Sequence, residues 1–297
     1  MRNRLVELIG NDFIKQNYFL TADLGFSVVE RLKRISSKRF LNVGVAENNM
    51  LTLAIGISEN LKKNEYVFCY SISPFIILRS LELIRNYLNY ENRKIRIIGV
   101  GSGLSYSFLG KTHFLMEDLN ILNGFKNLII LNPGNEIELN YVYKKFKNYN
   151  GPVYFRINKS QPIDTKGFVF KKKDSFFIKR GTGSNIIVSG KIYEFLNQNL
   201  TYDEIRKLNI ISIPIFNYEY CKNVYKFINK NQKTLCLVDN KQTLLFEKIK
   251  YHIRLITNKS VWNLDLDPTH ITDTGDEFEM LKQSGFSIRK IKNFILK

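Results

Sequence analysis

The 297-residue sequence lacks the features of membrane-spanning, secreted and disulfide-stabilised proteins. It contains no uninterrupted apolar run of about 18 residues, so no membrane-spanning helix is expected. The first residues, Met1 to Glu7, include no long apolar segment and no small-residue cleavage site, and they do not resemble a signal peptide. The three cysteines, Cys69, Cys221 and Cys236, are widely spaced and form no Cys-x-x-Cys pair. This spacing argues against a disulfide framework or a zinc site and is typical of the reducing cytoplasm.

The sequence also has few acidic residues, and its formal net charge is +18 at pH 7. Such an excess can indicate nucleic-acid binding. The basic residues are scattered, however, or gather in loop-like runs such as Lys171-Lys172-Lys173, and Lys, Asn and Ile are abundant together. We interpret the charge as a solvated surface and expect no nucleic-acid partner. Attraction of a phosphorylated ligand or of an acidic partner is the alternative use of this charge.

Strand-like apolar segments alternate with segments of helical periodicity along the chain, which predicts an α/β fold with two units. Residues 1–160 form the first predicted domain and residues 185–297 the second. Residues 161–184 are polar and lysine-rich and contain Pro162 and Gly167, so they are predicted to be a linker with one short strand at 167–170. In the first unit, helices are expected over residues 4–16, 47–61, 76–90 and 136–149.

The strongest functional signal lies between Phe40 and Met50. The apolar segment 40–45 is predicted to be a buried strand, and it ends just before Glu47. Met50, Leu53, Ala54, Ile57 and Leu61 follow at helical spacing and predict a buried helix face. A glutamate between a buried strand and a buried helix is unusual, because Glu is rarely buried without a partner. A helix-start glutamate held by the macrodipole is the alternative.

The string Asn-x-Gly-Val-Ala-Glu-Asn-Asn-Met, followed by Ala54-Ile55-Gly56, resembles the glutamate motif of the transketolase family, which uses thiamine diphosphate. The resemblance implies that Glu47 hydrogen-bonds N1′ of the cofactor's aminopyrimidine and activates the cofactor. Burial favours the protonated form of such a glutamate, whereas the helix N-terminus favours the ionised form. A proton shared with N1′ is consistent with both effects.

A second resemblance lies in the glycine-rich stretch after residue 100. Gly110-Lys111-Thr112-His113, followed by Glu117-Asp118, is similar to the family's Gly-x-Thr-His element and Glu-Asp pair. It implies that His113 faces the cofactor and the substrate hydroxyls, where a histidine can move protons. Lys111, where the family often has proline, is predicted to contact substrate. A structural histidine is the alternative for His113.

Four more residues are assigned by resemblance. Phe75 is expected to stack on the pyrimidine ring, and Ile72 stands where the family often has a second aromatic residue contacting the cofactor. Asp23, in Thr-Ala-Asp-Leu-Gly, is expected near the cofactor, with a helix cap as the alternative. Arg156, in the strand predicted over residues 151–157, is expected to reach a substrate phosphate. A surface arginine on an edge strand is the alternative for Arg156.

The sequence contains no Gly-Asp-Gly followed some thirty residues later by asparagine, the family's signature for holding Mg²⁺ and the diphosphate, and Gly275-Asp276-Glu277 does not replace it. The chain therefore resembles the C-terminal half of a split transketolase, with a pyrimidine-binding domain and then a C-terminal-like domain. Each would be a mainly parallel sheet flanked by helices. The resemblance is weaker after residue 185 and includes the closing segment 269–281. No metal ligand is expected in this chain.

The resemblance implies a separate N-terminal-half subunit that holds the diphosphate and Mg²⁺, in a heterotetramer or around a homodimer of this chain. The expected activity, present only in that complex, is transfer of a two-carbon ketol unit between sugar phosphates or related sugars. One alternative is a pyruvate-using relative, similar to deoxyxylulose-phosphate synthase or to the beta subunit of a 2-oxo-acid dehydrogenase. Another is a non-catalytic scaffold partner.

Overall fold

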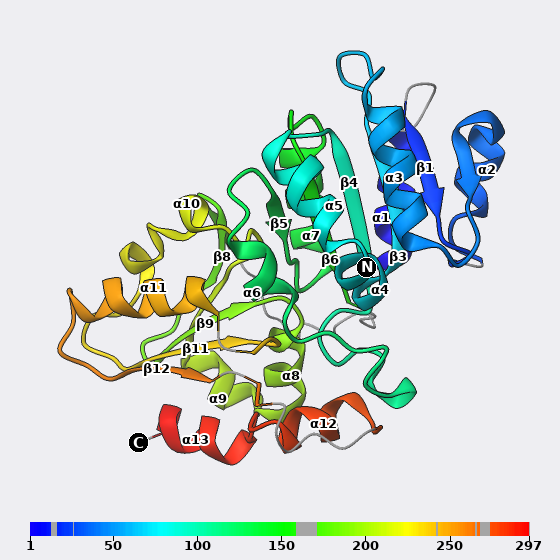
Figure 1. The fold of residues 1–297 in the computed structure, drawn as a ribbon. Coiled ribbons are helices and arrows are strands. Elements are labelled where there is room, and N and C mark those ends of the chain that lie inside the picture. Colours follow the sequence, from blue (N-terminus) through cyan, green and yellow to red (C-terminus); the bar gives the residue numbers. More distant parts are fainter. Residues whose placement is uncertain are drawn as a thin grey trace.

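The structure, a computed structural model, describes residues 1–12, 17–25, 27–158, 171–241, 243–264, 266–267 and 274–296. Two α/β units follow one another along the chain, and each contains a six-stranded sheet (Figure 1). No helix among the described residues is long and apolar enough to cross a membrane.

The first sheet has the strand order β2-β1-β3-β4-β6-β5, and every neighbouring pair is parallel. Its strands are β1 (Tyr18–Thr21), β2 (Phe40–Asn42), β3 (Val67–Ile72), β4 (Ile95–Val100), β5 (Ile129–Leu131) and β6 (Val153–Ile157). Its helices are α1 (Arg2–Asp12), α2 (Glu30–Ile35), α3 (Glu47–Ser58), α4 (Ser73–Arg79), α5 (Leu81–Leu83), α6 (Asp118–Asn123) and α7 (Glu136–Phe146).

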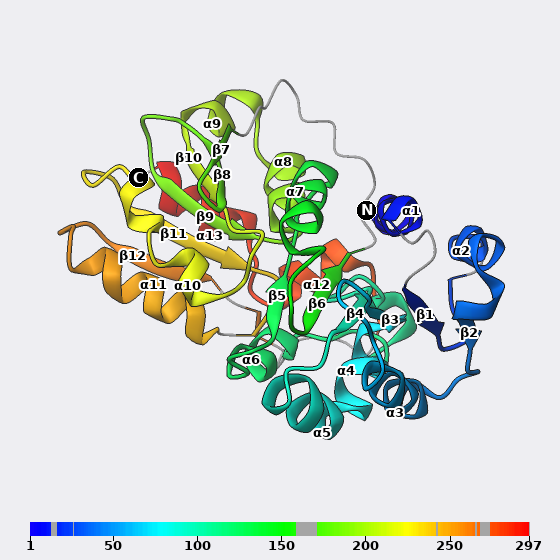
Figure 2. The same ribbon diagram turned by 90° about the horizontal axis from the view of Figure 1, so that it is seen from above.

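Alternating side chains of the first sheet face two separate helical layers. Leu20, Cys69 and Ile97 pack in the core that contains α3, α4 and α6, while Phe19 and Phe68 face α1 and α7. Figure 2 shows α3, α4 and α5 on one face of the sheet and α1 and α7 on the other. The central strands are buried on both faces, as is usual for a parallel sheet covered by helices.

The second sheet has the order β12-β11-β9-β10-β8-β7, in which the first four strands are parallel and β8 and β7 are antiparallel. The strands are β7 (Lys171–Lys173), β8 (Phe176–Lys179), β9 (Asn185–Ser189), β10 (Asn209–Ser212), β11 (Thr234–Val238) and β12 (Val261–Leu264). The helices are α8 (Ile192–Asn199), α9 (Tyr202–Lys207), α10 (Tyr218–Cys221), α11 (Leu244–Arg254), α12 (Glu277–Gln283) and α13 (Ile288–Leu296).

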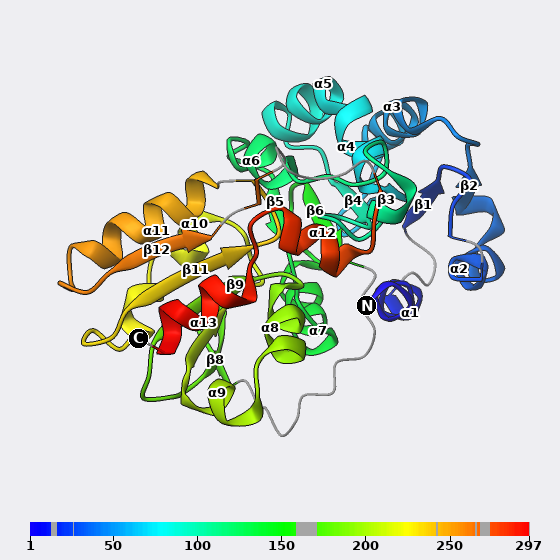
Figure 3. The same cartoon turned by 90° about the horizontal axis from the view of Figure 1, so that it is seen from below.

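Figure 3 shows α12 and α13 on one face of the second sheet and α11 on the other. The predicted α/β class with two mainly parallel sheets is therefore confirmed. The units are also joined at β5, where the Asn132 amide donates to the Pro214 carbonyl (2.8 Å) and the Phe216 amide donates to the Ile130 carbonyl (2.8 Å). These bonds give the edge strand of the first sheet a partner from the second unit.

Some local predictions were wrong. Of the segment 40–45 before Glu47, only Phe40–Asn42 forms a strand, β2, at the edge of the sheet; Leu41 is 37% exposed, and Val45, beyond the strand, is 73% exposed. Leu53, expected in the helix core, is 40% exposed, because the buried face of α3 is centred on Met50, Leu51, Ala54 and Ile55. The single helix expected over 76–90 is divided into α4, α5 and a π-helical segment over residues 84–90.

Part of the predicted linker is also sheet. Residues 171–173 and 176–179 form the β7–β8 hairpin, and Phe176, Phe177 and Ile178 are buried, so burial of these apolar side chains holds the segment against β10. The short strand predicted at 167–170 and residues 269–273 of the closing segment lie outside the described residues.

Candidate functional site

Glu47 is the first residue of α3, and its side chain is only 1% exposed. The Ser71 hydroxyl donates to Glu47 Oε1 (3.1 Å), and Arg79 Nη1 donates to Glu47 Oε2 (2.7 Å). A buried carboxylate requires such partners, because an unpaired buried charge is strongly destabilising. The pairing of Arg79 with Glu47 was not predicted from the sequence.

Phe75 and Arg79 lie one helical turn apart on α4, so both can face α3. The Arg79 guanidinium lies over the Phe75 ring, with its central carbon 4.2 Å from the ring centroid. The edge of the His113 ring meets the same phenyl group, with ring centroids 5.1 Å apart and an interplanar angle of 70°. The structure therefore brings Glu47, Arg79, Phe75 and His113 together in one continuous cluster, although the residues come from three separate stretches of sequence.

The loop that carries His113 depends on glycine. Gly101 and Gly103 have φ values of 74° and 61°, and a Cβ on Gly101 would come within 2.0 Å of the Tyr106 ring. The Leu115 amide donates to the Gly103 carbonyl (2.9 Å), which closes the loop on itself. His113 Nδ1 lies 2.9 Å from the Thr112 hydroxyl. These contacts fix the position from which His113 reaches Phe75.

The second unit also holds this loop. The Ser107 hydroxyl donates to the Gly275 carbonyl (2.8 Å), and the Lys241 amide donates to the Met116 carbonyl (2.7 Å). The loop with the candidate histidine is thus held by Lys241, which lies between β11 and β12, and by Gly275, which follows β12.

Asp23 lies at the end of β1 in the left-handed region, with φ 53°. Its carboxylate accepts a hydrogen bond from Asn42 Nδ2 (2.9 Å), and both residues line a pocket of about 170 Å³. The alternative of a helix cap was wrong, because α2 begins at Glu30 with Val29 at the N-cap. Ile72 is partly exposed directly before α4, and Lys111 is exposed two residues before His113.

Arg156 is placed differently from what the sequence suggested. Its side chain is fully buried, and Nε donates to Asp118 Oδ2 (2.8 Å) while Nη1 donates to Asp239 Oδ1 (2.7 Å). Nη1 and Nη2 also contact Asn132 Oδ1 (3.3 Å) and the Asp239 carbonyl (3.2 Å). Burial by itself lowers the pKa of Arg156, but the two carboxylates raise it by more, so the guanidinium stays charged. This placement argues against the predicted phosphate contact and against a surface arginine on an edge strand.

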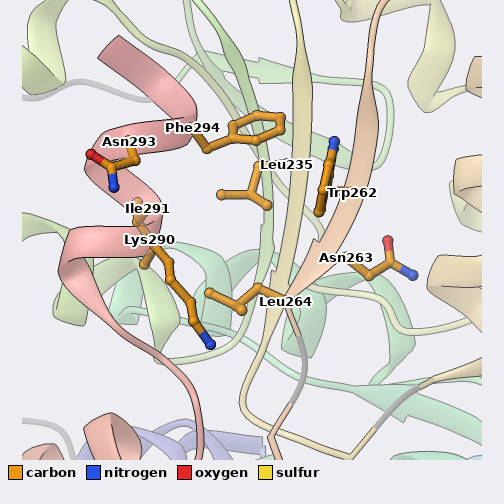
Figure 4. Close-up of a pocket in the computed structure, with 8 residues that line it drawn as sticks. All are labelled: Leu235, Trp262, Asn263, Leu264, Lys290, Ile291, Asn293 and Phe294. Atoms are coloured by element: carbon orange, nitrogen blue, oxygen red, sulfur yellow. The ribbon is translucent and has the colours of Figure 1, made fainter. Parts of the chain in front are cut away.

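Two other features bear on ligand binding. Within the described ranges, no group of three or more His, Cys, Asp or Glu residues is arranged to hold a metal ion. An apolar pocket of about 510 Å³ lies between α13 and strands β11 and β12 (Figure 4). Phe294 on the helix and Leu235 and Trp262 on the strands line this pocket, which contains none of the predicted site residues.

Residues 14–162 match the family profile described as transketolase, pyrimidine binding domain. The chain belongs to the transketolase family. The matched range contains Glu47, Phe75 and His113, and this family membership confirms the resemblance on which their assignment was based.

The matched relatives include transketolase sections and subunits and also 1-deoxy-D-xylulose-5-phosphate synthases. A putative transketolase C-terminal section from Methanocaldococcus jannaschii is 29% identical over 221 residues, which is 72% of this chain and 67% of the relative. An apulose-4-phosphate transketolase subunit from Actinobacillus succinogenes is 28% identical over 180 residues, 59% of this chain and 57% of the relative. The 1-deoxy-D-xylulose-5-phosphate synthase from Fusobacterium nucleatum is 29% identical over 200 residues, 64% of this chain and 32% of that protein.

Among solved structures, a split gene transketolase described as an inactive beta4 tetramer superposes with a TM-score of 0.73 at 19% identity. The match covers 99% of this chain and 94% of that one. At this identity the match establishes the fold of both units. This transketolase-family chain is thus similar in fold, over nearly its whole length, to a subunit of a split transketolase.

Proposed function

We propose that this chain is the C-terminal-half subunit of a split transketolase that transfers a two-carbon ketol unit between sugar phosphates or related sugars. The observation that carries the proposal is the burial of the Glu47 carboxylate at the start of α3, in one cluster with Phe75 and His113. These are the residues that the family motif assigns to cofactor activation, ring stacking and proton movement.

The cluster fits the aminopyrimidine of thiamine diphosphate. Glu47 offers carboxylate oxygens to a ring N–H group, and Phe75 offers an aromatic face to a flat heterocycle. A planar N–H donor already occupies the space between these two residues, since the Arg79 guanidinium contacts both. When bound, thiamine diphosphate supplies the carbon nucleophile that attacks the ketose carbonyl.

We assign each side chain one task. Glu47 holds the shared proton at the ring nitrogen, and Ser71 fixes the orientation of its carboxylate from the opposite oxygen. Phe75 orients the ring. His113 takes up and returns protons at the substrate hydroxyls through Nε2, because Thr112 contacts Nδ1. Asp23, Ile72 and Lys111 are proposed to line the cofactor and substrate side of the site.

A partner subunit is part of the proposal. The sequence does not contain the family's Gly-Asp-Gly and asparagine signature for holding Mg²⁺ and the diphosphate. Apolar side chains are also exposed just before α3 and on α3 and α4, with Val45 73%, Leu53 40% and Leu78 48% exposed. These exposed apolar side chains are available for packing against a partner chain. We propose that an N-terminal-half subunit covers them and completes the site, in a heterotetramer or around a homodimer of this chain.

The test is to co-express the chain with a candidate N-terminal-half subunit and to measure ketol transfer while thiamine diphosphate and Mg²⁺ are titrated. Activity is expected only in the mixture and is expected to be abolished by Glu47→Ala. Glu59→Gln is the matched control, because Glu59 is an exposed carboxylate at the other end of α3. Full activity of Glu47→Ala, or absence of both partner and cofactor binding, would refute the proposal and favour the scaffold alternative.

A pyruvate-using activity is the second candidate, because a deoxyxylulose-phosphate synthase is among the relatives. A donor screen with the same complex separates the two. Turnover of ketose phosphates without turnover of pyruvate supports ketol transfer, and the reverse pattern supports the pyruvate-using relative.

A further inference from the structure

Arg79 connects the two residues to which the proposed function assigns the aminopyrimidine. It is the last residue of α4, and its side chain is 49% exposed. From there it reaches back over the Phe75 ring, at 4.2 Å, and donates to Glu47 Oε2 at 2.7 Å. One guanidinium therefore covers both the aromatic surface and one oxygen of the buried carboxylate.

The chemistry of a guanidinium matches that of the ligand expected here. A guanidinium is planar and cationic, donates N–H groups in its plane to a carboxylate, and stacks through its face on an aromatic ring. A protonated aminopyrimidine has the same combination of a flat face, an in-plane N–H donor and positive charge. The two groups therefore compete for the same oxygen of Glu47 and for the surface of Phe75.

The energetics also allow Arg79 to pair with Glu47 temporarily and to be displaced. Glu47 is 1% exposed, so leaving it ionised without a partner would be costly. Arg79 supplies that partner from a half-exposed position, so its head group can move into water without losing its hydration. Its backbone is held separately, because Asn48 Nδ2 donates to the Arg79 carbonyl (3.0 Å). The exchange thus requires only a side-chain rotation.

We propose that Arg79 occupies the place of the aminopyrimidine in the unliganded chain and must leave Glu47 and Phe75 before the ligand binds. The inference rests on the proposed function, which assigns the ligand to those two residues. It makes Arg79 a positioning residue that keeps the buried carboxylate paired until the ligand takes over the same hydrogen bond.

The test uses the full chain and the free pyrimidine 4-amino-5-hydroxymethyl-2-methylpyrimidine, which requires neither the diphosphate site nor a partner. Its dissociation constant is measured by NMR titration for wild type, Arg79→Met, Glu47→Gln and Arg85→Met. Arg79→Met keeps an apolar stem but removes the donor. Arg85→Met is the matched control, because Arg85 also lies over an aromatic ring, that of Tyr90, at 4.9 Å.

Arg79→Met is expected to bind the pyrimidine about tenfold more tightly than wild type, because a charge-assisted hydrogen bond no longer has to be broken. Arg85→Met is expected to match wild type, and Glu47→Gln to bind weakly. General structural damage would weaken binding of the pyrimidine. Tighter binding by Arg79→Met therefore reports specifically on competition between Arg79 and the pyrimidine.

Equal or weaker binding by Arg79→Met would overturn the inference while leaving the proposed function intact, provided that Glu47→Gln still lowers the affinity. If no variant and not even wild type binds the pyrimidine, the assignment of Glu47 and Phe75 to the cofactor fails, and the inference fails with it.

Discussion

The buried ion pairs of Arg156 permit a prediction of large effect. Asp118 and Asp239, its two carboxylate partners, have side chains that are 0% and 5% exposed. Replacing Arg156 by Met leaves two buried carboxylates without their shared cation. Breaking a buried pair in this way costs about 3–5 kcal/mol, whereas losing an exposed pair costs less than about 1 kcal/mol.

The assay is urea unfolding of the full chain, followed by circular dichroism and by the fluorescence of the single tryptophan, Trp262, on strand β12 of the second sheet. Since Arg156 and Asp239 belong to different units, Arg156→Met is expected to separate the two signals as well as to lower the midpoint. Arg206→Met is the matched control, because Arg206 and its partner Asp203 are 65% and 78% exposed.

A loss of less than about 1 kcal/mol for Arg156→Met, equal to that of the control, would refute the reasoning about burial. If Arg156→Met instead raised the KM for a phosphorylated sugar and left the stability unchanged, the phosphate contact expected from the sequence would be supported. The experiment therefore separates the structural role from the substrate role of Arg156.

Three other features give measurable outcomes. Burial raises the pKa of Glu138 from 4.5 to about 7. Its protonated form therefore adds roughly 3 kcal/mol to the free energy of unfolding. This contribution is fully present below pH 4.5 and is lost as the pH rises through 7. Glu138→Gln should lose less stability than wild type between about pH 5 and pH 8 in urea unfolding, and parallel pH profiles would contradict this. Gly103→Ala should destabilise by about 1–3 kcal/mol, because φ is 61° and the new Cβ would lie 2.5 Å from Asp239 Oδ2. Gly56→Ala in α3, where the new Cβ meets nothing within 4 Å, should raise the stability of the chain by up to about 1 kcal/mol. Equal shifts of the melting temperature for Gly103→Ala and Gly56→Ala would refute this argument. All three cysteine thiols are buried, and burial raises the pKa of Cys221 to about 12, so a thiol reagent should react only after unfolding; rapid labelling of the native chain would contradict this.

The sequence predicted well those parts of the fold that depend on neighbouring residues. Strands such as Ile95–Val100 were recognised because their apolar residues are continuous, and α3 because apolar residues recur at helical spacing. The exposure of β2 was missed because composition does not state which strand lies at the edge of a sheet. The β7–β8 hairpin was assigned to a linker because β7 consists of three lysines and has no apolar pattern. Its position in the sheet is set by pairing with β8.

In the candidate site, too, local features were predicted from the sequence and long-range contacts were not. Glu47, Phe75 and His113 were found because each belongs to a local string that the transketolase family shares. The sequence by itself therefore determined the family and the α/β class, and it selected these three residues as candidates. Only the tertiary structure decided which charged groups meet. Arg79 pairs with Glu47 across 32 residues, and Arg156 with Asp239 across 83. Such pairs follow from how helices and sheets pack and from where side chains point, and no local pattern encodes that information.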